Sequence, residues 1–261
     1  MKIIEPAYQS VNLCFASNEK YAPHLATVLY SLLKNCDTKR MYDIIILHKD
    51  ICREQQEKIK NMEKEGNVSI RFISMAQCEK KVEYDVGVYY SIETNYRLFL
   101  FGEMFAKYDK ILYLDCDIIV EGYPYNVDNY RTEALGMQVP ENYFNAGVLV
   151  IDLKKIRQRI NQEQVFEILH RHNYKYNDQD VLNILFDGRV KVMDCRWNYM
   201  TYIPEQIAKE NVNNRKLYED LYREKPCIIH YTSAEKPWNT ETKVLGDRYW
   251  KYRNEMEAVY A

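Results

Sequence analysis

The sequence lacks the features that would place this protein in several structural classes. Its seven cysteines are scattered, and no two of them form a Cys-x-x-Cys pair. That pattern argues against a disulfide scaffold or a zinc site and indicates a reducing compartment. No apolar run approaches the ~18 residues of a membrane span, and the N-terminal residues contain no apolar signal segment. We therefore expect a cytoplasmic protein without a transmembrane segment.

A strong net charge and any sign of repetition are also missing. The 36 Lys and Arg residues nearly balance the 38 Asp and Glu residues, which leaves a formal charge of −2. No basic field therefore indicates nucleic acid or anionic lipid as a partner. No internal repeat, low-complexity tract or Gly/Ser linker divides the 261 residues, a length that suits one large α/β domain. The sequence thus predicts a single globular unit.

Strand-like and helix-like segments alternate in the first part of the chain. Short apolar runs predict strands at Val11–Ser17, Tyr42–His48 and Val68–Ser74. Helical patterns lie between them, one beginning near Pro23 and one at Arg53–Glu65. This alternation is typical of an α/β protein with a parallel sheet, in which ligands collect at the carboxyl ends of the strands.

The rest of the chain predicts further strands and helices. A long, buried helix is expected at Ser91–Lys107 and a charged amphipathic helix at Lys154–His172. Further strands are expected at Ala134–Val139, Val148–Ile151, Val190–Asp194 and Cys227–Tyr231, and further helices at Pro204–Arg223 and Gly246–Ala261.

The segment Lys110–Val120, KILYLDCDIIV, carries two carboxylates one residue apart. In an extended segment, Asp115 and Asp117 point to the same side. Two like charges held so close need a cation between them, and a hard divalent ion would also leave positions for a diphosphate. The alternative is an acidic turn after a strand, which an isolated Asp-x-Asp often is.

Other polar residues follow or interrupt apolar segments. Arg97 lies in the predicted buried helix, so it is either paired with a carboxylate or aimed into a site. Asn145 precedes Ala146 and Gly147, which allow a ligand to approach the backbone closely, although an ordinary tight turn explains the same residues. His230 ends a strand, where a core or loop histidine is commoner than a ligand.

The stretch Asn177-Asp178-Gln179-Asp180 precedes a short apolar helical run. A helix N-cap explains one Asn or Asp at such a position. It does not explain two acids and a Gln together, so this stretch is a further candidate for a site.

Together these motifs resemble the retaining nucleotide-sugar glycosyltransferases of family 8, which include glycogenin and the bacterial lipopolysaccharide galactosyl- and glucosyltransferases. The resemblance runs in the family's order from residue 11 to about 252 and is carried by FASNEKYA, YRLFL, ILYLDCDIIV, YFNAGVLVIDL, NDQDVLN and HYTSAEKPW. It implies a GT-A fold, an α/β architecture with a Rossmann-like, mostly parallel sheet flanked by helices in a single domain over residues 1–261. The nucleotide-binding half would span about 11–120 and the sugar- and acceptor-binding half about 121–261.

The resemblance also implies the ligands and the residues that bind them. The donor would be a UDP-sugar, and the metal would be Mn²⁺ rather than Mg²⁺, held by Asp115, Asp117 and His230, a mixed ligand set that suits a transition metal. Tyr21 would stack on uracil and Lys236 would bind the diphosphate. The implied cofactor-binding positions are Ala16, Asn18, Tyr21, Arg97, Asp115, Cys116, Asp117, Asn145, Ala146, Gly147, His230, Ser233 and Lys236.

The implied catalytic positions are three consecutive residues. Asp178 would bond donor hydroxyls, and Gln179 would lie near the anomeric carbon and stabilise positive charge by its amide dipole. Asp180 is the second candidate for a covalent role, because a carboxylate is a better nucleophile than an amide oxygen.

The sequence also departs from the family pattern. Asn18 stands where the family usually has Asp, and Ser233 replaces a common Gly near the phosphates. The chain is shorter between Asp117 and Asn145 than in the lipopolysaccharide enzymes, and Gln138-Val139-Pro140 replace a segment that often contains an acid.

The predicted activity is transfer of glucose or galactose from UDP to a hydroxyl of a glycan acceptor, such as lipopolysaccharide or a cell-surface oligosaccharide, with retention of configuration. One alternative is a UDP-sugar-binding protein without transferase activity. Another is a metal-dependent enzyme such as a nucleotidyltransferase. The latter usually needs a Gly-rich, basic loop after its first strand, whereas FASNEKYA contains no glycine.

Overall fold

The computed structural model describes residues 2–8, 10–63, 66–81, 91–122, 143–171, 174, 176–191, 193, 195–201, 225–241 and 243–260. The chain forms two compact units that alternate along the sequence. Unit 1 comprises Met1–Ala22, Thr38–Cys116 and Glu133–Val192, and unit 2 comprises Pro23–Asp37, Asp117–Thr132 and Met193–Ala261. The single domain with halves at about 11–120 and 121–261 stays a prediction.

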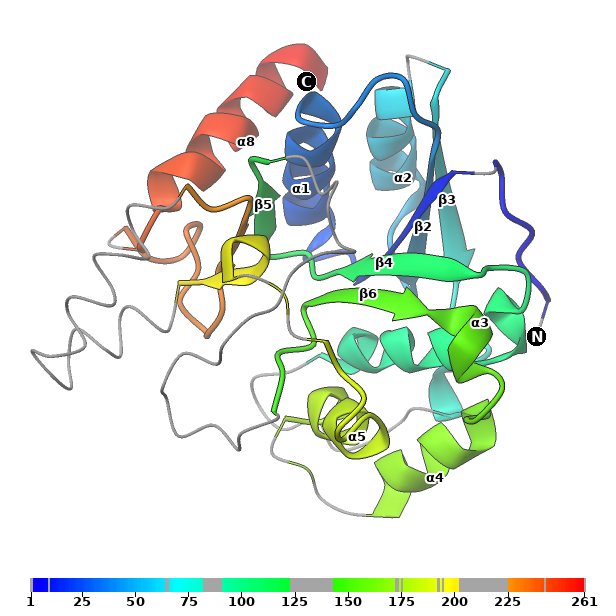
Figure 1. Cartoon of the computed structure of the whole chain (residues 1–261). Helices are drawn as coiled ribbons and strands as arrows, with labels where there is room; N and C mark the ends of the chain where they lie inside the picture. The colour runs from blue at the N-terminus through cyan, green and yellow to red at the C-terminus, as the bar shows by residue number, and fades with distance from the viewer. Residues whose placement is uncertain are drawn as a thin grey trace, which may run out of the picture. The chain divides into compact units, whose positions relative to one another are not determined.

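Unit 1 contains a five-stranded sheet with the order β3-β2-β1-β4-β6 (Figure 1). Its strands are β1 (Val11–Ser17), β2 (Tyr42–His48), β3 (Val68–Ser74), β4 (Lys110–Leu114) and β6 (Val148–Asp152). The first four run parallel to one another, and β6 pairs antiparallel with β4. Every residue of β2 is buried, as expected of an internal strand covered on both faces. The mostly parallel sheet predicted from the sequence is therefore confirmed.

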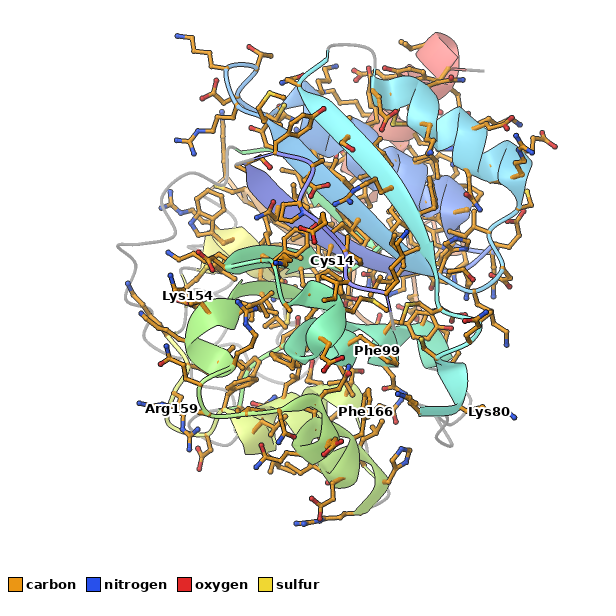
Figure 2. The ribbon with its side chains drawn as sticks, turned by 90° about the vertical axis from the view of Figure 1, so that its right-hand side faces the viewer. Cys14, Lys80, Phe99, Lys154, Arg159 and Phe166 are labelled. Atoms are coloured by element: carbon orange, nitrogen blue, oxygen red, sulfur yellow. The ribbon has the colours of Figure 1, made fainter. Side chains whose placement is uncertain are left out.

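Helices flank this sheet in unit 1, and those after Ser91 contribute buried residues to one apolar core with it. The helices are α2 (Arg53–Lys60), α3 (Leu153–Ile156), α4 (Gln162–Arg171) and α5 (Asp178–Leu185), together with 3₁₀ helices at Asn61–Glu63, Glu79–Lys81, Ile92–Phe101 and Glu103–Phe105. The rings of Phe99 and Phe166 meet edge to face with centroids 5.1 Å apart (Figure 2). This contact joins the longest 3₁₀ helix to α4.

Unit 2 contains a small three-stranded sheet with the order β5-β8-β7. Its elements are α1 (Ala22–Lys34, which enters the unit at Pro23), β5 (Ile118–Val120), a 3₁₀ helix at Cys195–Asn198, β7 (Tyr199–Met200), β8 (Ile228–His230) and α8 (Gly246–Tyr260). Ile119 and Ile229 pack with three tyrosines, Tyr231, Tyr249 and Tyr252, to form its core. None of the described helices combines the length and the apolar character that a bilayer crossing requires.

The predicted long helix at Ser91–Lys107 is wrong in type and in continuity. The segment forms two 3₁₀ helices that are separated at Gly102, whose backbone is extended at φ −111° and ψ −175°. A Cβ at this position would lie 2.3 Å from the side chain of Gln162. The break therefore lies where the Gln162 side chain at the start of α4 packs directly against Gly102.

The predicted helix at Lys154–His172 is also interrupted. It forms α3 and α4, and the second helix begins with a reciprocal cap. The backbone N–H of Gln164 donates to Asn161 Oδ1 at 2.9 Å, and the N–H of Asn161 donates to Gln164 Oε1 at 3.0 Å. This pair satisfies two helix-end donors and so favours a new helix start at this point.

The segment Lys110–Val120 forms two strands that belong to different sheets. β4 ends at Leu114 and β5 begins at Ile118, so Asp115, Cys116 and Asp117 form the connection between them. The chain passes from unit 1 to unit 2 between Cys116 and Asp117. The two carboxylates therefore lie on a strand-to-strand connection and not at the end of one continuous strand.

Three other predictions concern segments that are partly or wholly outside the described residues. The strand at Ala134–Val139, with Gln138-Val139-Pro140, and the helix at Pro204–Arg223 lie outside them. In the predicted strand Val190–Asp194, the described residues belong to no strand.

Candidate active site

The loop after β1 contains the residues predicted to bind uridine. The carbonyl of Ala16 accepts a hydrogen bond from the Cys116 thiol at 3.1 Å, which ties β1 to the Asp-Cys-Asp connection. Asn18 Oδ1 accepts the backbone N–H of Tyr21 at 3.0 Å, and Asn18 Nδ2 donates to Glu93 Oε2 at 3.1 Å. Both ends of the Asn18 amide thus bind protein groups. The predicted contacts of Asn18 and Tyr21 with uracil stay predictions.

Arg97 is buried among carboxylates that the sequence also singled out. Its Nε lies 2.7 Å from Asp178 Oδ2, and its Nη2 donates to Asp115 Oδ1 at 2.9 Å. Its Nη1 donates to the carbonyl of Ala146, and the guanidinium lies 4.5 Å from the ring centre of Tyr113. The pairing of Arg97 with carboxylates is therefore confirmed, and its place in a functional site stays a prediction.

Asp178 combines deep burial with one unused acceptor. Burial raises the pKa of its carboxyl group to about 6, the Asp115 charge adds to this, and the Arg97 charge opposes it. Its Oδ2 atom accepts no hydrogen bond, because the Nε–H of Arg97 is directed to the Thr94 carbonyl at 3.0 Å. Asp178 Oδ2 is therefore a buried oxygen that is held by its ion pair with Arg97.

Helix α5 holds the Phe-Asn-Ala-Gly turn with two amide side chains one helical turn apart. Gln179 Oε1 accepts the backbone N–H of Ala146 at 3.0 Å and Asn145 Nδ2 at 3.1 Å. Asn183 Oδ1 accepts the N–H of Phe144 at 2.7 Å, and its Nδ2 donates to the Phe144 carbonyl at 2.9 Å. Residues four apart on a helix share one face, so Gln179 and Asn183 bind consecutive parts of the turn.

The same turn is joined to the first carboxylate of the connection. Asn145 Oδ1 accepts the N–H of Gly147 at 2.9 Å, and the Gly147 carbonyl accepts the N–H of Asp115 at 2.8 Å. Unit 1 thus brings Arg97, Asp115, Asp178 and the turn into one hydrogen-bonded cluster.

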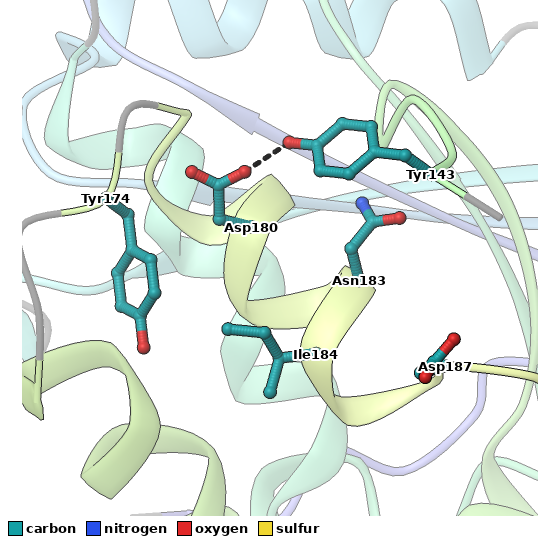
Figure 3. A pocket seen from close by; sticks show the side chains of 6 residues that line it. All are labelled: Tyr143, Tyr174, Asp180, Asn183, Ile184 and Asp187. Atoms are coloured by element: carbon teal, nitrogen blue, oxygen red, sulfur yellow. Dashed lines mark hydrogen bonds between the residues drawn. The ribbon is translucent and has the colours of Figure 1, made fainter. Parts of the chain in front are cut away.

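Asp180 is engaged by two donors from outside its helix. Its Oδ1 accepts the hydroxyl of Tyr143 (Figure 3), and its Oδ2 accepts the N–H of Tyr176 at 2.8 Å. The Tyr143 oxygen in turn accepts Gln179 Nε2 at 3.1 Å. Sequence reasoning missed Tyr143 and Asn183, although one directly precedes the Phe-Asn-Ala-Gly motif and the other follows Gln179 by four residues.

In unit 2, Asp117 is surrounded by two basic side chains. Its Oδ1 lies 3.2 Å from His230 Nε2 and its Oδ2 lies 2.5 Å from Lys236 Nζ. Burial alone would raise the pKa of Asp117, but the charges of Lys236 and His230 outweigh it and hold the pKa well below its usual range. Asp117 is therefore an ionised carboxylate even though it is buried.

The imidazole of His230 is oriented by a residue that the sequence did not reveal. His230 Nδ1 lies 2.8 Å from Asn198 Oδ1. An amide oxygen accepts, so Nδ1 donates this bond, and in the neutral form of the ring Nε2 would present its lone pair to the Asp117 carboxylate. Two acceptors that face each other suit a shared cation, and metal-binding histidines commonly donate their other N–H in this way. The residues present therefore fit a divalent metal.

Ser233 and Lys236 follow β8 in the same unit. Ser233 has φ of 84°, a left-handed conformation that favours glycine, which agrees with the Gly common here in the family that the sequence resembles. Lys236 is buried, and besides Asp117 it donates to the Tyr231 carbonyl at 2.7 Å. Its ammonium group is thus held beside the second carboxylate of the connection.

Comparison with known proteins places these features in one family. The sequence matches the model of glycosyl transferase family 8 over residues 12–123 and 121–242. General stress protein A of Bacillus subtilis is 25% identical over 93% of this chain and 92% of its own length. Lipopolysaccharide 1,2-glucosyltransferase of Escherichia coli K12 is 30% identical over 60% of this chain and 52% of its own.

Solved structures agree with this match. Galactosyltransferase LgtC in complex with donor and acceptor sugar analogues superposes with a TM-score of 0.73 and 25% identity, over 94% of this chain and 96% of that one. The GT-A fold predicted from the sequence is therefore confirmed.

Proposed function

Because this chain belongs to glycosyl transferase family 8, we propose that it transfers glucose or galactose from a UDP-sugar to a hydroxyl of a glycan acceptor with retention of configuration. The observation that carries the proposal is the pairing of Asp117 with His230 and Lys236. This cluster combines ligands for a cation with an ammonium group that suits an anionic phosphate.

The metal would be held by Asp115, Asp117 and His230, each of which offers one ligand atom. One residue separates the two aspartates, so their Cα atoms are at most about 7 Å apart. Carboxylate and imidazole ligands together favour Mn²⁺ over Mg²⁺ or Ca²⁺. When bound, the ion would neutralise charge on the diphosphate leaving group.

The chain's own side chains would bind and orient the donor. Lys236 supplies a positive point charge to the diphosphate, and Asp178 is the candidate to bond donor-sugar hydroxyls. Arg97 keeps Asp178 in place. Gln179 remains the candidate for the residue near the anomeric carbon, with Asp180 as the alternative nucleophile.

The acceptor would be a saccharide hydroxyl, and lipopolysaccharide is the glycan that the names of the relatives favour. The Escherichia coli relative is named a lipopolysaccharide 1,2-glucosyltransferase. The superposed galactosyltransferase was crystallised with an acceptor sugar analogue. Both names support a sugar acceptor, and one glucosyl and one galactosyl enzyme leave both donor sugars in the proposal.

The test is a screen of UDP-sugars for UDP release with Mn²⁺, with glycan acceptors and with water alone, followed by NMR of the product anomer. We expect release from UDP-glucose or UDP-galactose that needs an acceptor, stops in excess chelator and is lost in Asp117→Ala. A protein that binds these donors but releases no UDP with any acceptor would be a sugar-nucleotide-binding protein, and the proposal would be wrong. An inverted product would refute retention.

A further inference from the structure

A row of hydrogen bonds links the Phe-Asn-Ala-Gly turn to Asp180, and the direction of every bond in it is determined. The backbone N–H of Ala146 can only donate, so the Gln179 atom 3.0 Å from it is the amide oxygen. The other end of that amide, Nε2, therefore faces the Tyr143 hydroxyl at 3.1 Å. Because Nε2 donates, the hydroxyl oxygen accepts this bond and has its own proton available for Asp180 Oδ1.

Tyr143 is the one member of this row that lies on neither α5 nor the turn itself. Its hydroxyl touches two residues of the predicted catalytic stretch at once, Gln179 and Asp180. Its ring is half-buried and lines an open hollow of about 470 Å³ on the side of α5 that carries Asp180 and Asn183 (Figure 3). The hydroxyl can therefore be removed while the ring keeps its place.

We propose that Tyr143 is a positioning residue for the transfer reaction, and that its hydroxyl anchors the Nε2 end of the Gln179 amide and couples it to Asp180. This inference rests on the proposed function. Gln179 Oε1 is bound by two donors, so a reversed amide would direct its NH₂ group at the N–H of Ala146. Tyr143 anchors the opposite end, which leaves the amide a single orientation.

The expected consequence lies in turnover more than in binding. Without the hydroxyl, Gln179 Nε2 loses its acceptor and Asp180 Oδ1 loses a donor, so both side chains gain freedom. Small displacements of a group at the reacting centre can cost on the order of 10²-fold in rate. The nucleotide is expected to bind as before, because the hydrogen bonds of this row join the turn to α5, whereas the predicted metal ligand Asp117 and the predicted diphosphate ligand Lys236 bind each other, and Lys236 also binds the Tyr231 carbonyl.

The first arm of the test compares Tyr143→Phe with Tyr174→Phe. Tyr174 lines the same hollow, but its hydroxyl donates to the Ile168 carbonyl in α4 at 2.8 Å. With Mn²⁺ and UDP-glucose or UDP-galactose, Tyr143→Phe should lower kcat about 10-fold or more and leave the Kd for UDP within about 2-fold. Tyr174→Phe should match the wild type. Equal turnover in Tyr143→Phe and wild type would overturn the inference.

A second arm separates positioning from a general structural effect. In a Gln179→Ala background, Tyr143→Phe should cause no further loss, because the residue through which it acts is gone. A loss that multiplies with that of Gln179→Ala would show that Tyr143 acts independently, and the inference would be wrong.

A third arm needs no activity. Hydrogen exchange of the Gln179 side-chain amide, followed by ¹⁵N NMR and assigned with Gln179→Ala, should become several-fold faster in Tyr143→Phe and stay unchanged in Tyr174→Phe. An unchanged rate in Tyr143→Phe would overturn the inference. Absence of UDP release by the wild type would refute the proposed function, and the exchange rate alone would then decide whether Tyr143 holds Gln179.

Discussion

Arg97 Nε lies 2.7 Å from Asp178 Oδ2, and both side chains are only 5% exposed. The same guanidinium donates to Asp115, so a single buried cation compensates two carboxylates. Breaking a buried ion pair by removing one partner leaves an uncompensated charge and is strongly destabilising.

We therefore expect Arg97→Ala to lower the free energy of unfolding by about 3–5 kcal/mol, measured by urea denaturation. Arg171→Ala is the matched control, since Arg171 forms an exposed pair with Glu167 on α4, and exposed pairs contribute about 0–1 kcal/mol. Similar small losses in both variants would contradict the structural role given to Arg97.

The raised pKa of Asp178 makes a prediction about pH. Between its ordinary value of 3.8 and about 6, the folded protein keeps a proton that the unfolded chain has released. The free energy of unfolding should therefore fall as pH rises through this window, by on the order of 3 kcal/mol.

Asp178→Asn cannot titrate, so the stability of the wild type relative to this variant should decline from about pH 4 to pH 6 and then level off. Taking the difference cancels the contributions of other carboxylates. Denaturant unfolding at several pH values provides the measurement, and a difference that is flat with pH would show that Asp178 titrates normally.

Asn198 should control the affinity for metal without touching the ion. Loss of a group that orients a ligating histidine typically weakens metal binding 10–100-fold. We expect Asn198→Ala to weaken Mn²⁺ binding in the presence of UDP by this factor, as measured by calorimetry. Asn198→Asp retains an acceptor for His230 Nδ1 and should bind Mn²⁺ close to normally. Equal affinities in Asn198→Ala and wild type would remove Asn198 from the site.

Ser233 should be less favourable than glycine at its own position, because φ is 84°. Its hydroxyl accepts from Lys243 Nζ at 3.3 Å, so Ser233→Ala and Ser233→Gly lose the same contact and differ only in backbone freedom. Ser233→Gly should be more stable than Ser233→Ala by about 1 kcal/mol or more in thermal or urea unfolding. Equal stability would mean that the conformation carries no strain.

Strands were predictable from the sequence where the determining pattern was local. The apolar runs that form β1, β2 and β3 are bounded by polar residues, and their limits agree with the structure. Apolar residues on nearly every side of Ser91–Lys107 indicate a buried helix, but they do not distinguish an α-helix from a 3₁₀ helix. The prediction of one long helix was therefore wrong. The break in this segment lies at Gly102, which packs against Gln162, a residue distant in sequence.

The same distinction between local patterns and long-range contacts applies to the residues of the candidate site. The residues that carry recognisable motifs, such as Asp115, Asp117 and His230, could be named from the sequence. Their supporting partners could not, because those contacts join segments far apart in the chain. Asn198 beside His230 and Tyr143 beside Asp180 are residue types that occur on any surface, and only the folded chain gives them a role.

The attachment of the Phe144–Gly147 turn bears on how specificity could diversify. Gln179 and Asn183 clamp the turn from α5, and the Asp115 backbone and Arg97 bind it from the other side. Four residues outside the turn therefore hold it in register. Substitutions that preserve these anchors can vary the surroundings of the turn without moving it, which gives a laboratory or a lineage a route to new specificity.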